Sequence, residues 1–171
     1  MEQDAELARR AAEGDSAAFT ALVRLHEAKV RRFLSRLVRG DGADDLAQEV
    51  FIKAWRLAPR WREEGPYGAW LMRIAWTSFL SDHKARGRRA ARDQAALPEP
   101  VPAQSADAAI DLKRALAGLG ERERAAALLC FGEGHSHGEA AAILDLPLGT
   151  VKSLVARARA HLLRYLETGH D

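Results

Sequence analysis

The sequence predicts an all-α protein with two small helical domains joined by a Pro-rich linker, the C-terminal one a helix-turn-helix. Apolar residues recur at three- and four-residue steps along most of the chain, and no stretch alternates β-branched and polar residues as a strand would. Three prolines within residues 98–102 interrupt the helical periodicity, which indicates an extended linker. We therefore expect a first domain over residues 1–92, a linker over 93–106 and a second domain over 107–171.

Composition limits the class of protein. Hydrophobic residues make up 47% of the chain and charged residues 29%, which is typical of a globular protein and excludes a disordered one. The single cysteine, Cys130, excludes an internal disulfide framework and suits a reducing cytoplasm. No apolar run reaches the length of a membrane span, and the acidic N-terminus lacks a signal-peptide core. We expect a cytoplasmic protein with no membrane insertion.

Four helices are predicted in the first domain, over about residues 4–13, 16–40, 43–57 and 67–86. Ser16 is the expected N-cap of the second helix, which ends at Gly40. The outer side of the third helix carries Asp44, Asp45, Gln48 and Glu49. These residues lie near its N-terminus, where the helix dipole favours negative charge. Taken alone, they indicate no more than ordinary helix-end electrostatics.

Aromatic and basic residues gather around the fourth helix. The four tryptophans of the chain are Trp55, Trp61, Trp70 and Trp76. Most are expected in the core, because large aromatic side chains dominate small helical cores, while one or two exposed rings would stack on unpaired bases. The helix ends in a basic run, Lys84, Arg86, Arg88, Arg89 and Arg92. This run indicates either a solvated helix end or a contact with a nucleic-acid backbone.

The second domain is expected to hold helices over residues 106–119 and 121–131, followed by a helix-turn-helix over 136–166. Ser136 and Glu139 form a capping-box pattern, and Pro147 ends the helix that they start. The last helix buries one apolar stripe and exposes short residues at its N-terminal end, with arginines further along. Such a helix is able to enter a DNA major groove, although a basic face alone is also typical of a solvated amphipathic helix.

Patterns that carry catalysis are absent from the sequence. His135 and His137 lie two residues apart without a cysteine or carboxylate at metal-ligand spacing. There is no glycine-rich phosphate loop and no nucleophile elbow. The sequence therefore predicts a protein that is not an enzyme and that uses no metal or cofactor.

Three stretches of the chain resemble one family. Residues 44–55, DDLAQEVFIKAW, are similar to the second region of bacterial RNA polymerase sigma factors of the extracytoplasmic-function (ECF) group. Residues 70–75, WLMRIA, match the DNA-melting helix of that family, and residues 149–159 resemble its fourth region. The three stretches occur in the family's order and span nearly the whole chain, so the resemblance is specific.

The resemblance implies a sigma factor that directs core RNA polymerase to specific promoters and helps to open the DNA. It implies that the clamp helices of the largest polymerase subunit are contacted by Asp44, Asp45, Gln48 and Glu49. It implies that the minus-ten element is bound and melted by Trp61, Arg73, Trp76, Thr77, Lys84 and Arg86. It implies that the minus-35 element is read by a recognition helix with Gly149, Thr150, Lys152, Ser153, Arg157 and Arg159. An anti-sigma factor is the regulatory partner that the family implies.

The sequence departs from the family at two points. Trp76 and Thr77 stand where the family usually has Arg-Asn, so we expect an unusual minus-ten preference. Leu154 stands where the family often has arginine, and we expect it to pack rather than to contact DNA. Two other functions are open at this level: a free-standing helix-turn-helix regulator, and a protein-interaction module that mimics a sigma factor.

Overall fold

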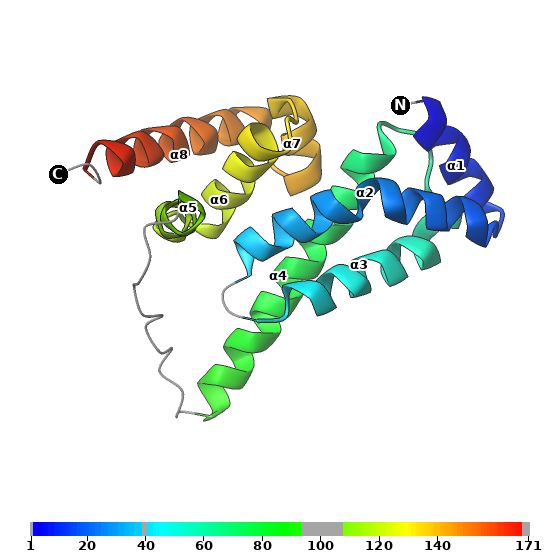
Figure 1. Ribbon diagram of the computed structural model, residues 1–171, viewed down its shortest axis with the longest axis horizontal. Coiled ribbons are helices and arrows are strands. Elements are labelled where there is room, and N and C mark those ends of the chain that lie inside the picture. The colour runs from blue at the N-terminus through cyan, green and yellow to red at the C-terminus, as the bar shows by residue number, and fades with distance from the viewer. Residues whose placement is uncertain (1, 39–40, 94–107, 169–171) are drawn as a thin grey trace.

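The computed structural model of the chain describes residues 2–38, 41–93 and 108–168, in which all regular structure is helical. Figure 1 shows two groups of helices, α1 to α4 and α5 to α8. The α-helices of these ranges are α1 (Glu2–Ala12), α2 (Ser16–Leu37), α3 (Ala43–Leu57), α4 (Tyr67–Asp93), α5 (Ala108–Ala117), α6 (Glu121–Ala127), α7 (His137–Leu144) and α8 (Leu148–Thr168). A 3-10 turn, η1 (Ala58–Arg60), follows α3, and a π-helical turn, η2 (Leu128–Gly132), follows α6. The predicted all-α fold with its helix-turn-helix is confirmed, whereas the linker predicted over 93–106 lies, apart from Asp93, outside the described residues.

Local chemistry decides where the N-terminal helices begin and end. The N-cap of α2 is Asp15 and not the predicted Ser16, since the Asp15 carboxylate accepts hydrogen bonds from the amides of Ala17 (2.9 Å) and Ala18 (3.0 Å). A carboxylate suits this position because it faces the positive end of the helix dipole. Helix α4 continues beyond the predicted end at Arg86 to Asp93, because lysine and arginine are good helix formers.

The turn between α2 and α3 depends on a glycine. Gly42 adopts the left-handed conformation, with φ at +107°, which glycine tolerates better than other residues. A Cβ atom at this position would lie 2.6 Å from Nη2 of Arg86. The Nη1 atom of Arg86 donates to the carbonyl oxygen of Asp41 at 3.3 Å. A side chain of α4 therefore packs directly over the turn that positions the start of α3.

The helix-turn-helix is held by its caps. The Oγ atom of Ser136 accepts a hydrogen bond from the Glu139 amide (3.2 Å), and Oε2 of Glu139 accepts one from the Ser136 amide (2.8 Å). Helix α7 ends at Asp145, which adopts the left-handed conformation with φ at +55°. The Pro147 carbonyl then accepts from the Val151 amide at 3.1 Å in the first turn of α8. The predicted capping box and proline break are confirmed.

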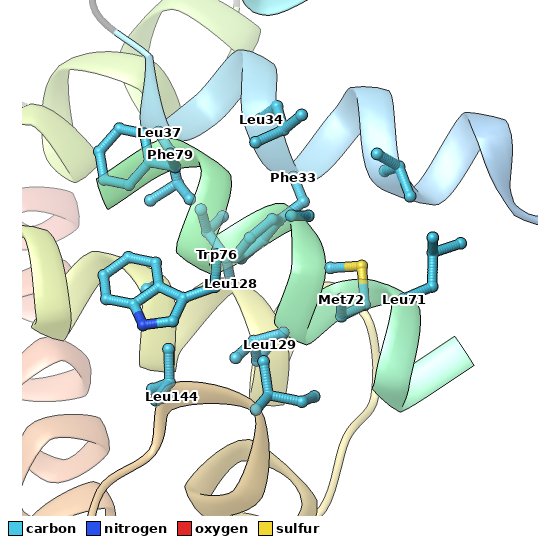
Figure 2. Packing of buried hydrophobic residues seen from close by; sticks show 14 of the residues in the cluster. Phe33, Leu34, Leu37, Leu71, Met72, Trp76, Phe79, Leu128, Leu129 and Leu144 are labelled. Atoms are coloured by element: carbon cyan, nitrogen blue, oxygen red, sulfur yellow. The ribbon is translucent and has the colours of Figure 1, made fainter. Parts of the chain in front are cut away.

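The two groups of helices share one hydrophobic core. Helix α4 packs against α7, and α2 packs against α6. Figure 2 shows Trp76 and Phe79 of α4 beside Leu128, Leu129 and Leu144 from the C-terminal group. Burying one large apolar side chain contributes about 1.5–3 kcal/mol to the free energy of unfolding, so this packing holds the two groups of helices together. We call this packed state the closed arrangement.

A buried arginine joins the two groups. Arg124 on α6 is 3% exposed, and its guanidinium donates to the carbonyl oxygens of Leu116 (2.8 Å), Leu119 (3.0 Å) and Leu37 (3.3 Å). Leu37 is the last residue of α2, so the cation also lies at the negative end of that helix dipole. One side chain therefore satisfies carbonyl groups from both groups of helices.

We expect Arg124→Met to lower the free energy of unfolding by about 3 kcal/mol, because several buried carbonyl groups lose their donor at once. The matched control is Arg122→Met, which changes an exposed arginine of the same helix and should stay within about 0.5 kcal/mol of wild type. Urea denaturation followed by circular dichroism measures both variants. Equal free energies of unfolding for the two would show that these carbonyl contacts do not stabilise the fold.

Candidate nucleic-acid and polymerase interfaces

Four exposed side chains form the acidic face of α3: Asp44, Asp45, Gln48 and Glu49. Asp44 forms an ion pair with Arg31 at 2.5 Å, and Glu49 lies 3.9 Å from Lys53. Exposed ion pairs of this kind contribute between zero and about 1 kcal/mol, so a partner displaces them at little cost. The opposite side of α3 is buried in the core. The acidic face is therefore a rigid, negatively charged surface that a basic protein surface is able to bind.

The aromatic cleft is a hollow of about 410 Å³ at the start of α4. Trp61 and Trp70 line it, and Tyr67 packs between them with ring centroids 5.9 Å and 5.3 Å away. Burial raises the pKa of the Tyr67 phenol well above its usual value, so this group stays neutral. Three arginines line the same cleft: Arg60, Arg62 and Arg73. Aromatic faces next to cations are the arrangement that captures unpaired bases and their phosphates.

Helix α7 forms the other wall of the aromatic cleft, through Gly138, Glu139, Ala142 and Ile143. The hydrogen bond from the Ser136 amide holds the pKa of the Glu139 carboxyl below its usual value, so it is ionised at neutral pH. Asp145, at the end of α7, places a carboxylate oxygen 3.6 Å from Nη2 of Arg73. In the closed arrangement, acidic side chains of the α7 segment therefore face a side of the cleft that carries three arginines and one carboxylate, Glu64.

The predicted DNA-binding residues of α4 differ in their exposure to solvent. Arg73, Thr77, Lys84 and Arg86 are exposed, although the Thr77 hydroxyl donates to the Arg73 carbonyl at 3.0 Å and Arg86 pairs with Asp82 at 2.7 Å. Trp76 is only 2% exposed and packs on Phe79 with ring centroids 5.6 Å apart. A base cannot reach this indole in the closed arrangement. Trp76 is therefore left out of the DNA-contacting set proposed below.

On α8 the buried stripe consists of Val151, Leu154, Val155 and Ala158. The predicted packing of Leu154 is confirmed. The predicted recognition residues are exposed: Gly149, Thr150, Lys152, Ser153, Arg157 and Arg159. The Nε atom of Arg157 donates to Glu123 of α6 at 2.7 Å. This contact uses only Nε, and the Arg157 side chain is 64% exposed, so it remains able to contact a phosphate. The N-terminal end of α8 also faces solvent.

Sequence reasoning missed two sets of residues. Arg60 and Arg62 flank Trp61, and this alternation of basic and aromatic residues is the pattern that would have indicated them. Arg32 and Glu133 form a bidentate ion pair between the two groups of helices. They lie 101 residues apart in the chain, and no local pattern connects such a pair.

Together, the helix-turn-helix, the aromatic cleft and the acidic face define a helical DNA-binding protein that also presents a surface for a protein partner. Across residues 2–38, 41–93 and 108–168, no cluster of His, Cys, Asp and Glu side chains is placed to hold a metal ion. Within the same ranges, no helix combines the length and apolar character that crossing a bilayer requires.

Comparison with known proteins gives the family. Residues 22–89 match the family model of sigma-70 region 2, and residues 109–162 match that of sigma-70 region 4. The ECF RNA polymerase sigma-E factor of Escherichia coli is 33% identical over 172 residues, which cover 91% of this chain and 90% of that protein. The ECF sigma factor SigM of Mycobacterium tuberculosis is 35% identical over 172 residues, covering 97% and 87% of the two chains.

Solved structures of related proteins have the same fold. The sigma factor RpoE of Bartonella quintana superposes with a TM-score of 0.80 at 31% identity, covering 87% of this chain and 96% of that one. CnrH superposes with a TM-score of 0.76 at 29% identity, covering 97% and 98%. The chain belongs to the ECF group of RNA polymerase sigma factors. As a member of that group it directs RNA polymerase to promoters and takes part in transcription initiation.

Proposed function

We propose that the acidic face of α3 binds the clamp helices of the largest RNA polymerase subunit. Its four side chains are exposed, carry negative charge at a helix N-terminus, and lie within the residues that match sigma-70 region 2. A rigid helix that displays carboxylates loses little side-chain freedom on binding a basic partner. The observation that carries the proposal is the exposure of this face in the closed arrangement, where the protein is able to dock without rearrangement.

The proposed minus-ten surface consists of the aromatic cleft and the exposed side of α4, with Trp61, Arg73, Thr77, Lys84 and Arg86 as its contacts. Flipping a base out of the duplex costs a few kcal/mol. Stacking on an indole returns about 1–3 kcal/mol per base. The cations add phosphate contacts that hold the separated strand. Arg60, Arg62 and Trp70 extend the surface, because they line the same cleft.

The proposed minus-35 reader is α8. Gly149, Thr150 and Ser153 are short, so they let the helix backbone approach base edges in the major groove. Lys152, Arg157 and Arg159 supply phosphate contacts, which position the helix on the duplex. The support is the exposure of all six residues along a helix whose opposite side is buried.

The chain acts, in this proposal, as a specificity subunit in the cytoplasm that carries no catalytic site, metal or cofactor of its own. Its functional units are a polymerase- and minus-ten-binding domain over residues 1–92, a linker over 93–106 and a minus-35-binding domain over 107–171. An anti-sigma factor is the proposed regulatory partner. The support is that the similar RpoE of Bartonella quintana was solved in complex with the anti-sigma factor NepR, and CnrH with the cytosolic domain of CnrY.

Run-off transcription with purified core polymerase on a pooled promoter library tests this assignment. We expect wild type to start transcripts from a defined subset of promoters, and Trp61→Ala/Arg73→Ala to lower the yield from that subset by at least about tenfold, through loss of stacking and of one phosphate contact. The same promoters with the minus-ten region already unpaired should recover part of the yield. Full activity of the variant on intact duplex promoters would contradict the proposed melting surface.

A further inference from the structure

A buried histidine lies directly behind the aromatic cleft. His26 of α2 is 8% exposed, and its ring packs on that of Tyr67 with centroids 5.5 Å apart. Tyr67 in turn packs against Trp61 and Trp70, the two indoles that line the cleft. These four rings form a continuous series of contacts, which leads from the interior of the N-terminal group of helices to the surface assigned to unpaired bases.

Helix α1 anchors this histidine. The Nε2 atom of His26 lies 3.0 Å from a carboxylate oxygen of Asp4. An ionised carboxylate only accepts hydrogen bonds, so Nε2 of the neutral ring carries the proton and donates it. Helix α1 packs against both α2 and α4, so this hydrogen bond joins elements that are already in contact. It therefore fixes the orientation of the ring.

The opposite edge of the His26 ring meets the first turn of α4. A Cβ atom at Gly68 would lie 3.2 Å from Cε1 and 3.5 Å from Nδ1 of His26, so the helix comes this close because residue 68 has no side chain. Gly68 directly follows Tyr67, the first residue of the helix. The position of the histidine ring therefore limits where the Tyr67 ring lies.

We propose that His26 is a positioning residue for base capture, which holds Tyr67 and through it the two cleft indoles in the geometry that receives unpaired bases of the minus-ten strand. This inference rests on the assignment of the aromatic cleft to that strand. A preorganised stacking surface loses little conformational freedom on binding, which raises its affinity for flipped bases. The histidine touches no DNA itself and acts through Tyr67.

The role of His26 depends on its protonation state. Burial lowers the pKa of His26, and this effect outweighs the opposing effect of the Asp4 carboxylate, so the ring is neutral at neutral pH. A further proton would enter at Nδ1, on the edge that faces the first turn of α4, where the helix dipole is positive. A cation at this place is disfavoured, so protonation weakens the contact between the ring and α4.

The other charged and titratable groups near the ring do not offset that cost. They come from α2, from α4 and from the segment between α6 and α7, and are Lys29, Tyr67, Glu133 and His135. Lys29 is itself a cation, and the Glu133 carboxylate already accepts both hydrogen bonds of Arg32. Because the pKa of His26 is lower in the folded chain, its contribution to stability is fully present above about pH 6.5 and is lost as the pH falls.

A double-mutant cycle in the polymerase holoenzyme tests the proposal. The variants are Asp4→Ala, His26→Leu and the double Asp4→Ala/His26→Leu. His26→Gln is the conservative replacement, because its amide is able to donate to Asp4 but does not titrate. The matched control is Glu2→Ala, which removes one exposed carboxylate from the same turn of α1.

The probe is a fluorescein-labelled fragment of a promoter that wild type transcribes, with its minus-ten region left unpaired. A duplex fragment that ends upstream of the minus-ten region is the reference, because it lacks the bases that the aromatic cleft would hold. Fluorescence anisotropy gives the affinity of each holoenzyme for both fragments, at about pH 8 and at about pH 6, on either side of the ordinary histidine pKa.

At about pH 8 we expect Asp4→Ala and His26→Leu each to lower the affinity for the unpaired fragment about tenfold, with unchanged affinity for the reference, and the double to lose no more than either. His26→Gln should stay within about threefold of wild type. Between about pH 8 and about pH 6, wild type should lose about threefold more affinity for the unpaired fragment than His26→Gln loses. Glu2→Ala should match wild type throughout.

Three results would overturn the proposal: wild-type affinity of Asp4→Ala for the unpaired fragment, additive losses in the double variant, or equal pH dependence in wild type and His26→Gln. Asp4→Ala and the pH comparison decide the matter even where His26→Leu is too unstable to fold, because the Asp4 side chain is partly exposed.

Trp61→Ala separates a failure of this inference from a failure of the cleft assignment. If Trp61→Ala weakens binding to the unpaired fragment while the variants of Asp4 and His26 do not, the cleft assignment stands and only the role of His26 is wrong. If Trp61→Ala binds both fragments as wild type does, the cleft assignment is wrong and this inference is wrong with it.

Discussion

The triple variant Asp45→Ala/Gln48→Ala/Glu49→Ala is expected to bind core RNA polymerase about 100-fold more weakly than wild type, a loss of roughly 2.7 kcal/mol. The three side chains are exposed and project from one face of α3, so their removal leaves the core of the domain unchanged. The loss comes from charge complementarity with a basic surface, and it should therefore shrink as salt is added. Competition binding with labelled wild-type protein measures the affinity at two salt concentrations.

A control triple for this experiment is available on the neighbouring helices. Gln3→Ala/Glu13→Ala/Glu27→Ala likewise removes one glutamine and two carboxylates, from exposed positions in α1, in the turn that follows it and in α2. It should keep wild-type affinity for polymerase, because it changes the net charge equally without touching the acidic face. If both triples weakened binding to the same extent, overall charge would explain the effect and the acidic face would have no specific role.

The double variant Arg157→Ala/Arg159→Ala is expected to lower binding of the holoenzyme to duplex promoter by about 10- to 100-fold, because each lost phosphate contact removes a sequence-independent part of the affinity. The slope of log affinity against log salt should fall by up to about two. The Glu123 carboxylate offsets part of the Arg157 charge, so Arg159→Ala alone should account for the larger share of the lost affinity. Filter binding with a promoter selected by wild type measures these quantities.

The pair Arg9→Ala/Arg24→Ala controls for the loss of two positive charges, since both arginines are exposed on the N-terminal helices. We expect it to leave promoter binding and the salt slope close to wild type. A variant of Arg157 and Arg159 that loses affinity at all salt concentrations equally would contradict a phosphate role. Such a result would indicate instead that these arginines stabilise the packing of α8 on α6.

Most of the fold was predictable because most of it is locally encoded. Ser136 and Glu139 satisfy each other's backbone amides, and Pro147 cannot continue α7, so the boundaries of the helix-turn-helix follow from a few adjacent residues. The wrong prediction of the α2 N-cap also has a local cause. Two acceptors, Asp15 and Ser16, compete for the same amides, and the carboxylate also gains an ion pair with Arg10.

The contact between the two groups of helices was not predictable from local patterns. Trp76 lies on a helix whose apolar stripe is broad enough either to bury it or to leave it exposed, and the structure buries it against residues of the C-terminal group of helices. Arg32 and Arg124 read in the sequence as ordinary surface cations, yet one meets a buried carboxylate and the other a set of backbone carbonyls. Such contacts depend on how two separately encoded surfaces meet, and periodicity carries no information about that.

The shared core also makes it costly in hydration free energy to separate the two groups of helices. Any separation of the two groups of helices would uncover apolar faces that include Leu128, Leu129 and Leu144, and water would have to order around them unless another surface replaced the lost contact. Each of these side chains is worth roughly 1.5–3 kcal/mol when buried. A partner that separates the two groups of helices therefore has to cover these faces with apolar surface of its own if the separated form is to be stable.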